Sequence, residues 1–179
     1  MNLFILSLVH SKCAEWMIDK HISKMIIEAV QMLSTGKRIL DPEDVEEKDL
    51  QIYKLAHRNH PTTIWIRNSL ENYIWTLLMV EAMHNEWKYR YGHPPDKMHA
   101  SYLIAITLAK NLPNKSRFPE KGLTPFALAM PKEYKPAVYN SHEDAVEAYK
   151  RYYQSPEKQR FAKWKNRDRP EWYVLEKSN

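Results

Sequence analysis

Four polar side chains follow one another at helical spacing early in the chain and could carry out acid–base chemistry. They are His21, Lys24, Glu28 and Gln31. Because these positions are three or four residues apart, they share one stripe along the side of a helix. The stripe holds an imidazole, a cation, a carboxylate and an amide, a combination that can bind a polar substrate and move protons.

Glu28 is the candidate catalytic carboxylate, with His21 and Lys24 beside it. A carboxylate on a hydrophobic helix near cations can stabilise a developing oxocarbenium ion or shuttle a proton in glycosidic chemistry. Gln31 and Asp19 are candidate substrate contacts, although Asp19 faces the apolar side of the helix, where an unpaired carboxylate would be costly. The plainer alternative is a core helix with an ordinary solvated edge.

A second group of polar residues follows in the segment HRNHPTTIWIRNSLENYIW, residues 57–75. We expect it to form the opposite wall of the site and to contact the substrate. Its candidate residues are Arg58, His60, Arg67 and Asn72.

The C-terminal part of the chain is basic and aromatic. Residues 150–169 hold eight lysines or arginines against two acids, a local net charge of +6. Cations interleaved with flat rings suit a phosphate backbone and stacked bases. The alternative is an amphipathic helix whose rings face the core while its cations are merely solvated. The candidate DNA-binding residues are Lys150, Arg151, Lys163, Lys165, Arg167, Arg169, Trp172 and Tyr173.

Hydrophobic periodicity and helix-ending residues predict the elements that must position these side chains. The expected helices span residues 13–35, 42–57, 62–91 (with a candidate break near Asn68), 96–110, 141–153 and 156–166. Gly36 and Gly92 are the expected C-caps of the first and third helices. Residues 111–140, which contain five prolines, predict a long irregular loop. The fold class is therefore all-α, a compact single-domain bundle of about six helices covering residues 1–179.

Composition agrees with one compact domain and with an anionic partner. The chain has 179 residues, only three glycines, a net charge of +5 and a pI near 9.1. Its one cysteine, Cys13, excludes an internal disulfide and fits a reducing cytoplasm. The apolar start, MNLFILSLV, is too short to span a membrane and lacks the features of a signal peptide. We interpret it as a buried N-terminal segment and expect no membrane partner.

Several other kinds of site have little support. His10 with Cys13, and His57 with His60, resemble metal-ligand pairs, but neither spacing is diagnostic and we predict no metal. A glycine-rich phosphate loop and a Gly-x-Ser-x-Gly elbow are both missing, and we expect no cofactor. Cys13 has histidines nearby, but a free cysteine is more often simply buried than nucleophilic.

Four stretches resemble the phage-type pyrimidine-dimer DNA glycosylases, the endonuclease V group. The stretches are MNLFILSLV at the start, Asp19-x-His21 followed seven residues later by Glu28, GKRI at 36–39, and RPEWYVLEK at 169–177. The resemblance implies a small all-α DNA repair enzyme. It further implies that the N-terminal amine attacks the sugar C1′ to form a Schiff base, with an essential glutamate at Glu28, a histidine in the site at His21, and a C-terminal tail that contacts the substrate.

The chain departs from that family at three positions. The family exposes a small residue after losing its initiator methionine, whereas Asn2 should leave Met1 in place, so the nucleophilic amine would be that of Met1. Leu3 and Ile27 stand where the family has arginines.

Three hypotheses follow. The first is a DNA-acting enzyme of phage type with glycosylase-like chemistry on a pyrimidine nucleotide. The second keeps the fold but makes the protein a transferase that attaches a small group to a modified thymine. The third is a non-enzymatic, basic nucleic-acid-binding protein.

Overall fold

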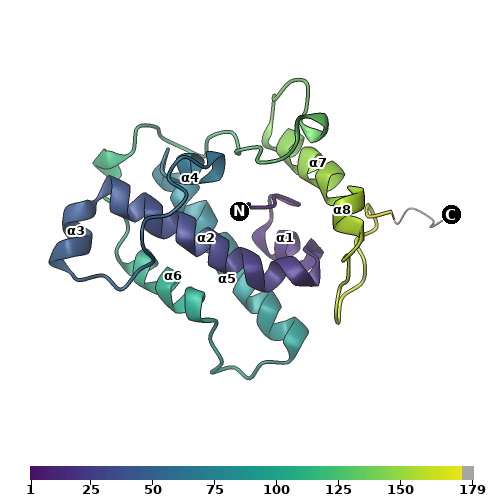
Figure 1. Ribbon diagram of the computed structural model, residues 1–179, viewed down its shortest axis with the longest axis horizontal. Coiled ribbons are helices and arrows are strands. Elements are labelled where there is room, and N and C mark those ends of the chain that lie inside the picture. The colour runs from purple at the N-terminus through teal and green to yellow at the C-terminus, as the bar shows by residue number, and fades with distance from the viewer. Residues whose placement is uncertain (175–179) are drawn as a thin grey trace.

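The computed structural model describes residues 1–174, and within them it contains helices and loops but no strand. Eight α-helices lie in this range (Figure 1). They are α1 (His10–Trp16), α2 (Asp19–Leu40), α3 (Pro42–Glu47), α4 (Pro61–Ile66), α5 (Leu70–Tyr91), α6 (Ala100–Lys110), α7 (His142–Tyr153) and α8 (Pro156–Gln159). Short 3₁₀ turns, Lys115–Arg117 and Lys132–Tyr134, interrupt the long loop. The predicted all-α class and compact helical bundle are confirmed.

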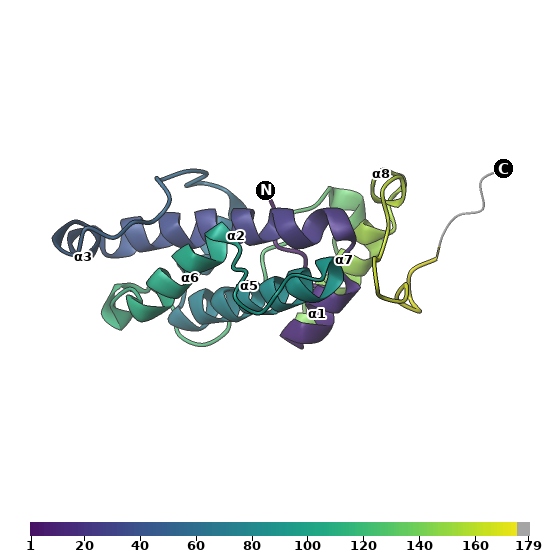
Figure 2. The ribbon, with the colours of Figure 1, turned by 90° about the horizontal axis from the view of Figure 1, so that it is seen from below.

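The two longest helices, α2 and α5, form the centre of the bundle. Each has 22 residues, and α2 packs against α5, α4 and α6, while α1 packs on α5. Figure 2 shows α2 and α5 running in two neighbouring layers, with α6 beside them. The predicted apolar face of α2 is fully buried at Ile22, Ile26 and Val30. Burial of this face fixes the rotation of α2 and hence the direction in which its polar stripe points.

The helix predicted from Cys13 to Thr35 is wrong in its boundaries. The chain leaves α1 at Trp16 and turns extended at Met17 and Ile18 before α2 begins. A contact with the C-terminal part of the chain replaces a helical hydrogen bond between α1 and α2. The N–H of Ile18 donates to the Tyr153 hydroxyl instead of to a helical carbonyl. At the other end, α2 continues through Gly36 to Leu40.

Gly36 does not cap the helix, because α2 is buried on both sides of it. A Cβ at Gly36 would lie 3.5 Å from the Tyr73 ring, an ordinary van der Waals distance, so this turn of α2 packs against α5. Such packing outweighs the roughly 1 kcal/mol that one glycine costs a helix.

Other predicted boundaries are partly confirmed. The chain breaks between α4 and α5, around Asn68, and α5 ends at Gly92, whose φ of +62° suits glycine. By contrast α3 ends at Glu47 instead of near His57, because the chain turns at Asp49, whose φ is +45°, and the irregular segment that follows is bound to α2. The Arg38 guanidinium binds the Tyr53 and Ile52 carbonyls there.

Two further boundaries need correction. The helix expected from residue 96 begins at Ala100, because the His99 side chain accepts the Ser101 N–H as an N-cap. The helix expected to reach residue 166 ends at Gln159. The C-terminal segment beyond it instead packs against α1 and the start of α2, where the Lys163 carbonyl accepts the Asp19 N–H.

The irregular loop over residues 111–140 is confirmed and holds the N-terminus in place. Asn72 ties it to α5, since its side chain donates to Thr124 Oγ1 at 2.7 Å and accepts the Thr124 N–H at 3.0 Å. Farther along, the Ala129 carbonyl accepts from the Asn2 side chain at 2.8 Å. The N-terminal segment is buried as predicted, with residues 3–6 at most 3% exposed. None of the described helices combines the length and apolar character needed to cross a bilayer.

Candidate functional site

The amino end of the chain lies against the carboxylate of Glu28. The Met1 amine is 3.7 Å from Glu28 Oε2, and the N–H of Asn2 donates to the same oxygen at 2.8 Å. The other carboxylate oxygen, Oε1, is 3.6 Å from the Lys24 ammonium. The Glu28 side chain is 11% exposed and that of Lys24 is 61% exposed, so the carboxylate is held inside while the lysine reaches solvent. An amine and a carboxylate this close can share protons during a reaction.

Asn2 fixes the amino end in this position. Its amide nitrogen donates to the Ala129 carbonyl, while its amide oxygen accepts from the Leu3 N–H and the Tyr149 hydroxyl at 2.8 and 3.2 Å. From the sequence, Asn2 is notable only as the residue that retains Met1. Its partners come from a loop and a helix more than a hundred residues away, so no local pattern could have indicated this role.

A small pocket of about 130 Å³ opens beside Glu28 and the amino end. It is smaller than the 300–1,000 Å³ typical of pockets that enclose a whole ligand. It therefore suits one substituent of a larger substrate. The pocket is lined by Met1, Asn2, Phe4, His21, Lys24, Met25, Glu28, Tyr152 and Lys158.

His21 lines this pocket as a buried, neutral imidazole. Phe4 stacks on its ring at 4.4 Å between centroids, and the Tyr153 hydroxyl lies 2.7 Å from its Nδ1. Burial lowers the pKa of His21 to about 3, and the charges of Lys158, Lys24 and Lys20 act in the same direction. At neutral pH the ring therefore carries no charge.

Lys158, on α8, is a pocket residue that sequence analysis missed. It is 8% exposed, and its ammonium lies 5.0 Å from the centre of the Tyr152 ring and 5.7 Å from that of Phe4. Its ion-pair partner within residues 1–174 is Glu157 at 3.5 Å, a carboxylate that is itself 72% exposed. Lys158 belongs to the basic segment 150–169, which indicated DNA binding, but nothing in the sequence distinguished it from the other cations of that segment.

His60 also lies at the amino end of the chain. It caps α4, since its Nδ1 accepts the Thr62 N–H, and it makes a hydrogen bond with the backbone of Met1. Burial lowers the pKa of His60, as do its electrostatic interactions with the Met1 amine and His57. Arg67 instead donates to the Arg58 carbonyl at 2.7 Å. Of the predicted opposite wall, the structure thus brings His60 to the site.

The remaining residues predicted to contact the substrate either bind other parts of the protein or lie outside the pocket. Asp19 binds the fully buried Arg90 at 2.9 Å and accepts the Lys165 N–H. Asn72 is fully buried and ties the long loop to α5. Gln31 is half-buried on α2 and does not line the pocket.

The predicted DNA-binding residues are spread over α7 and the chain that follows α8. Lys163, Lys165 and Arg169 are exposed, whereas Tyr173 is 1% exposed. The Lys150 ammonium lies over both Trp16 and Trp172, whose rings meet edge to face at 5.8 Å.

The two predicted DNA-binding arginines not yet placed are engaged within the protein. Arg151 donates to the Tyr134 carbonyl at 3.1 Å, and Arg167 binds Glu86 through two nitrogens, at 3.0 and 2.8 Å. The stretch at 169–177 that resembles the family's tail is described only as far as residue 174, and residues 175–177 lie outside the described residues.

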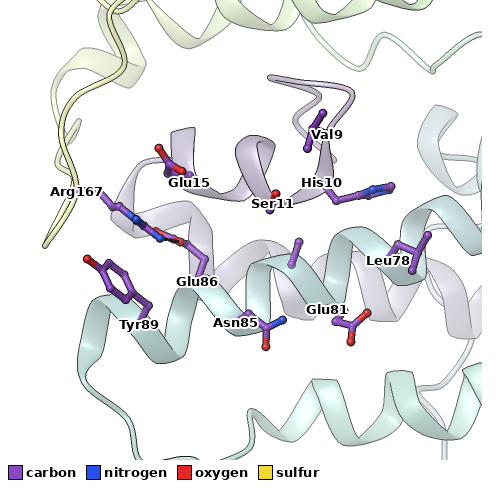
Figure 3. A pocket seen from close by; sticks show the side chains of 11 residues that line it. Val9, His10, Ser11, Glu15, Leu78, Glu81, Asn85, Glu86, Tyr89 and Arg167 are labelled. Atoms are coloured by element: carbon purple, nitrogen blue, oxygen red, sulfur yellow. Dashed lines mark hydrogen bonds and ion pairs between the residues drawn. The ribbon is translucent and has the colours of Figure 1, made fainter.

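A larger pocket, of about 510 Å³, lies between α1 and α5 and is a poor site for DNA (Figure 3). Three carboxylates, those of Glu15, Glu81 and Glu86, line it, and the last is bound by Arg167. Carboxylates repel a phosphate backbone. The smaller pocket, which holds Glu28 and the amino end of the chain, is the candidate active site.

The histidines and the cysteine considered as metal ligands do not gather. Within residues 1–174 no three histidine, cysteine or acidic side chains are placed to hold a metal ion together. Cys13 is fully buried, its S–H donates to the Phe4 carbonyl, and burial raises the pKa of its thiol to about 11. It is therefore a protonated core residue.

Comparison with known proteins adds one finding. The family model described as pyrimidine dimer DNA glycosylase matches residues 1–99, more than half of the chain, including the amino end, His21, Lys24, Glu28 and His60. No curated protein and no solved structure matches. The matched region contains α1 to α5, whereas Lys158 and the basic aromatic segment lie beyond it. The chain belongs to the pyrimidine dimer DNA glycosylase family.

Proposed function

We propose that this protein removes a pyrimidine from DNA, with the Met1 amine as nucleophile and Glu28 as the catalytic carboxylate. The observation that supports this assignment best is the 3.7 Å distance between the amine and Glu28 Oε2 within a pocket of the matched region. A carboxylate so placed can accept the proton that the amine must lose and can stabilise positive charge at C1′.

The reaction transfers C1′ of the target nucleotide from the base to the Met1 amine. The neutral amine attacks C1′ of the target nucleotide, the bond from C1′ to the base breaks, and the base leaves with the electron pair and takes up a proton. The attacking nitrogen then loses one proton to Glu28. Its lone pair forms the C1′=N bond as the C1′–O4′ bond breaks, and O4′ takes up a proton. The product is a protonated Schiff base between the chain and the opened sugar.

The pocket supplies cations from positions other than those of the family arginines. Leu3 is buried in the core and Ile27 carries no charge, but Lys24 and Lys158 line the pocket. We assign these two lysines to the phosphates next to the target nucleotide, because an ammonium contributes strongly to binding the DNA backbone. His60, at the amino end, completes this side of the site.

The C-terminal basic aromatic segment is assigned to the remainder of the DNA duplex. Lys163, Lys165 and Arg169 are exposed and available to phosphates, and Trp172 with Trp16 offers ring surface beside Lys150. Tyr173, being buried, would support this surface by packing on Trp164 and Trp172.

Borohydride trapping on a duplex with a single abasic site tests the proposal. Hydride reduces the Schiff base to a stable amine, so wild-type protein should give a covalent adduct that peptide mass spectrometry places on Met1. Glu28→Gln, which keeps the shape of the side chain, should bind the duplex but form adduct at least about 100-fold more slowly. Glu81→Gln, a carboxylate of the larger pocket, is the matched control and should behave as wild type.

The outcomes separate the hypotheses. Binding without an adduct would overturn the amine mechanism and favour a transferase, to be tested on modified-thymine DNA with small co-substrates. An adduct on a lysine would reject Met1 as the nucleophile. Equal adduct formation by wild type and Glu28→Gln would remove the carboxylate from the mechanism.

A further inference from the structure

The Tyr153 hydroxyl connects the start of α2 to the candidate active site. It is fully buried, accepts the Ile18 N–H at 3.2 Å, and lies 2.7 Å from Nδ1 of His21. Ile18 comes just before α2 and His21 lies in its first turn, so the two contacts hold the start of this helix. Neither the family match, which ends at residue 99, nor the basic pattern of the C-terminal segment assigns a role to this tyrosine.

These contacts decide which nitrogen of His21 carries the proton. A hydroxyl has one proton to donate, and the Ile18 N–H already occupies one of the lone pairs on its oxygen. Within residues 1–174, His21 Nδ1 is the acceptor in hydrogen-bond reach of that proton. If Nδ1 carried a proton instead, the hydroxyl proton would be buried without an acceptor, which is costly. Nδ1 is therefore the acceptor, and the ring proton lies on Nε2.

We infer that Tyr153 is a positioning residue that holds His21 as the neutral Nε2–H tautomer, so that His21 donates a hydrogen bond to a substrate oxygen and does not transfer a proton. The inference deepens the proposed function and rests on it for the identity of the substrate. The oxygen concerned is one that gains negative charge in the reaction, such as O4′ as its bond to C1′ breaks. The proton stays on Nε2 throughout, so no further group is needed to restore it.

The charged groups around His21 agree with this neutral form. Lys20 and Lys24 on its own helix and Lys158 on α8 each oppose a positive charge on the ring, and together with burial they lower its pKa to about 3. Glu28 and the Met1 amine line the same pocket and form an ion pair with each other. Phe4 covers one ring face, and Phe161 and Tyr153 lie at its edges.

Nitrogen NMR of histidine-labelled protein tests the tautomer directly. Wild-type His21 should show a proton on Nε2 and none on Nδ1 from pH 8 down to pH 5. Tyr153→Phe should give a mixture of tautomers and a higher pKa. Tyr149→Phe is the matched control, because it removes a fully buried hydroxyl from the same helix whose partners are Asn2, Ala127 and Ala129 and do not include His21. It should leave the His21 tautomer unchanged.

Activity provides a second readout. The amide nitrogen of glutamine can take the place of Nε2, whereas that of asparagine is shorter and resembles Nδ1. His21→Gln should therefore form the borohydride adduct within about 10-fold of wild type, and His21→Asn should be slower than His21→Gln. A proton on Nδ1 of wild-type His21, or a charged ring at pH 6, would overturn the inference whatever the activity. An absent adduct with the Nε2–H tautomer in place would instead reject the proposed function while leaving the role of Tyr153 intact.

Discussion

The backbone N–H of Asn2 donates to the Glu28 carboxylate at 2.8 Å, so the first peptide of the chain is bound to the middle of α2. The Asn2 side chain secures this arrangement from the opposite direction through the 111–140 loop and α7. The position of the Met1 amine thus depends on three segments that are far apart in the sequence.

Asn2→Leu should slow adduct formation and weaken the fold. Leucine keeps a bulky second residue, so Met1 should be retained, but the Leu3 N–H loses its acceptor and the Ala129 carbonyl loses its donor. We expect the free energy of unfolding to fall by about 1–3 kcal/mol and the borohydride adduct to form about 10-fold more slowly or worse, because the amine is no longer aligned. Urea denaturation, single-turnover trapping and intact mass provide the measurements.

The exposed Asn85 on α5 supplies the control for that experiment. Asn85→Leu should change neither quantity. An Asn2→Leu protein that retains Met1 and traps the duplex at the wild-type rate would show that the asparagine side chain does not align the amine.

Asp19→Asn should destabilise the protein through the buried Arg90. The arginine is 0% exposed and is bound by Asp19 and Glu86, so removing one carboxylate charge leaves it only partly compensated. We expect a loss of about 3 kcal/mol in the free energy of unfolding, measured by urea denaturation at pH 7. Asp168→Asn, at an exposed aspartate, should cost less than about 0.5 kcal/mol. Equal stability of the two variants would mean that the ion pair contributes little and that Asp19 is free to serve the substrate.

The polar stripe of α2 was predictable because it depends on local geometry alone. His21, Lys24 and Glu28 lie on one helix, and residues three or four apart in a helix must share a face whatever surrounds them. The irregular loop was predictable for a similar reason, since its prolines prevent regular hydrogen bonding. The family resemblance pointed to two of these residues, His21 and Glu28.

The rest of the site depends on tertiary contacts that no short pattern contains. Asn2 and Lys158 line the pocket and Tyr153 contacts His21 behind it, and these three residues come from three different segments. The break between α1 and α2 was hidden for the same reason, because the bond from Ile18 to Tyr153 compensates for lost helical bonds. Asp19 looked like a costly unpaired acid until Arg90, on a different helix, supplied its partner.

The neutral state of His21 should make stability fall on mild acidification. Its pKa is lowered from the ordinary 6.5 to about 3. Between these values the unfolded chain binds a proton at this residue and the folded chain does not, so acid favours unfolding. Well below pH 6.5 the contribution of His21 is a loss of ~1.4 kcal/mol per pH unit, and it ends near pH 3. Above pH 6.5 both states are neutral and the effect vanishes.

Denaturation of wild type and His21→Gln between pH 7 and pH 5 isolates this contribution. The variant lacks the titrating ring, so its free energy of unfolding should fall less steeply with decreasing pH. The difference between the two slopes should approach the value for one bound proton. Over this range most carboxylates stay ionised and the other histidines are common to both proteins. Parallel slopes would mean that folded His21 takes up its proton as readily as the unfolded residue, contrary to a buried neutral ring.

Lys158→Met should reduce the dependence of DNA binding on salt. The Lys158 ammonium lines the pocket, and its ion-pair partner within residues 1–174 is the exposed Glu157. Its charge is therefore only weakly neutralised and is available for a phosphate. Loss of one phosphate contact should lower the slope of log K against log salt by about 0.9. Binding of an abasic duplex measured between about 50 and 200 mM salt gives that slope.

Two controls separate charge from structure. Lys110→Met removes an exposed lysine at the end of α6, outside the pocket, and should leave the slope at the wild-type value. Lys158→Arg retains the charge and should preserve the slope even if the longer guanidinium disturbs the rings of Tyr152 and Phe4. If Lys158→Met lowered stability with an unchanged slope, the lysine would be a packing residue, and the phosphate beside the target nucleotide would have to be bound by Lys24 alone or by the C-terminal cations.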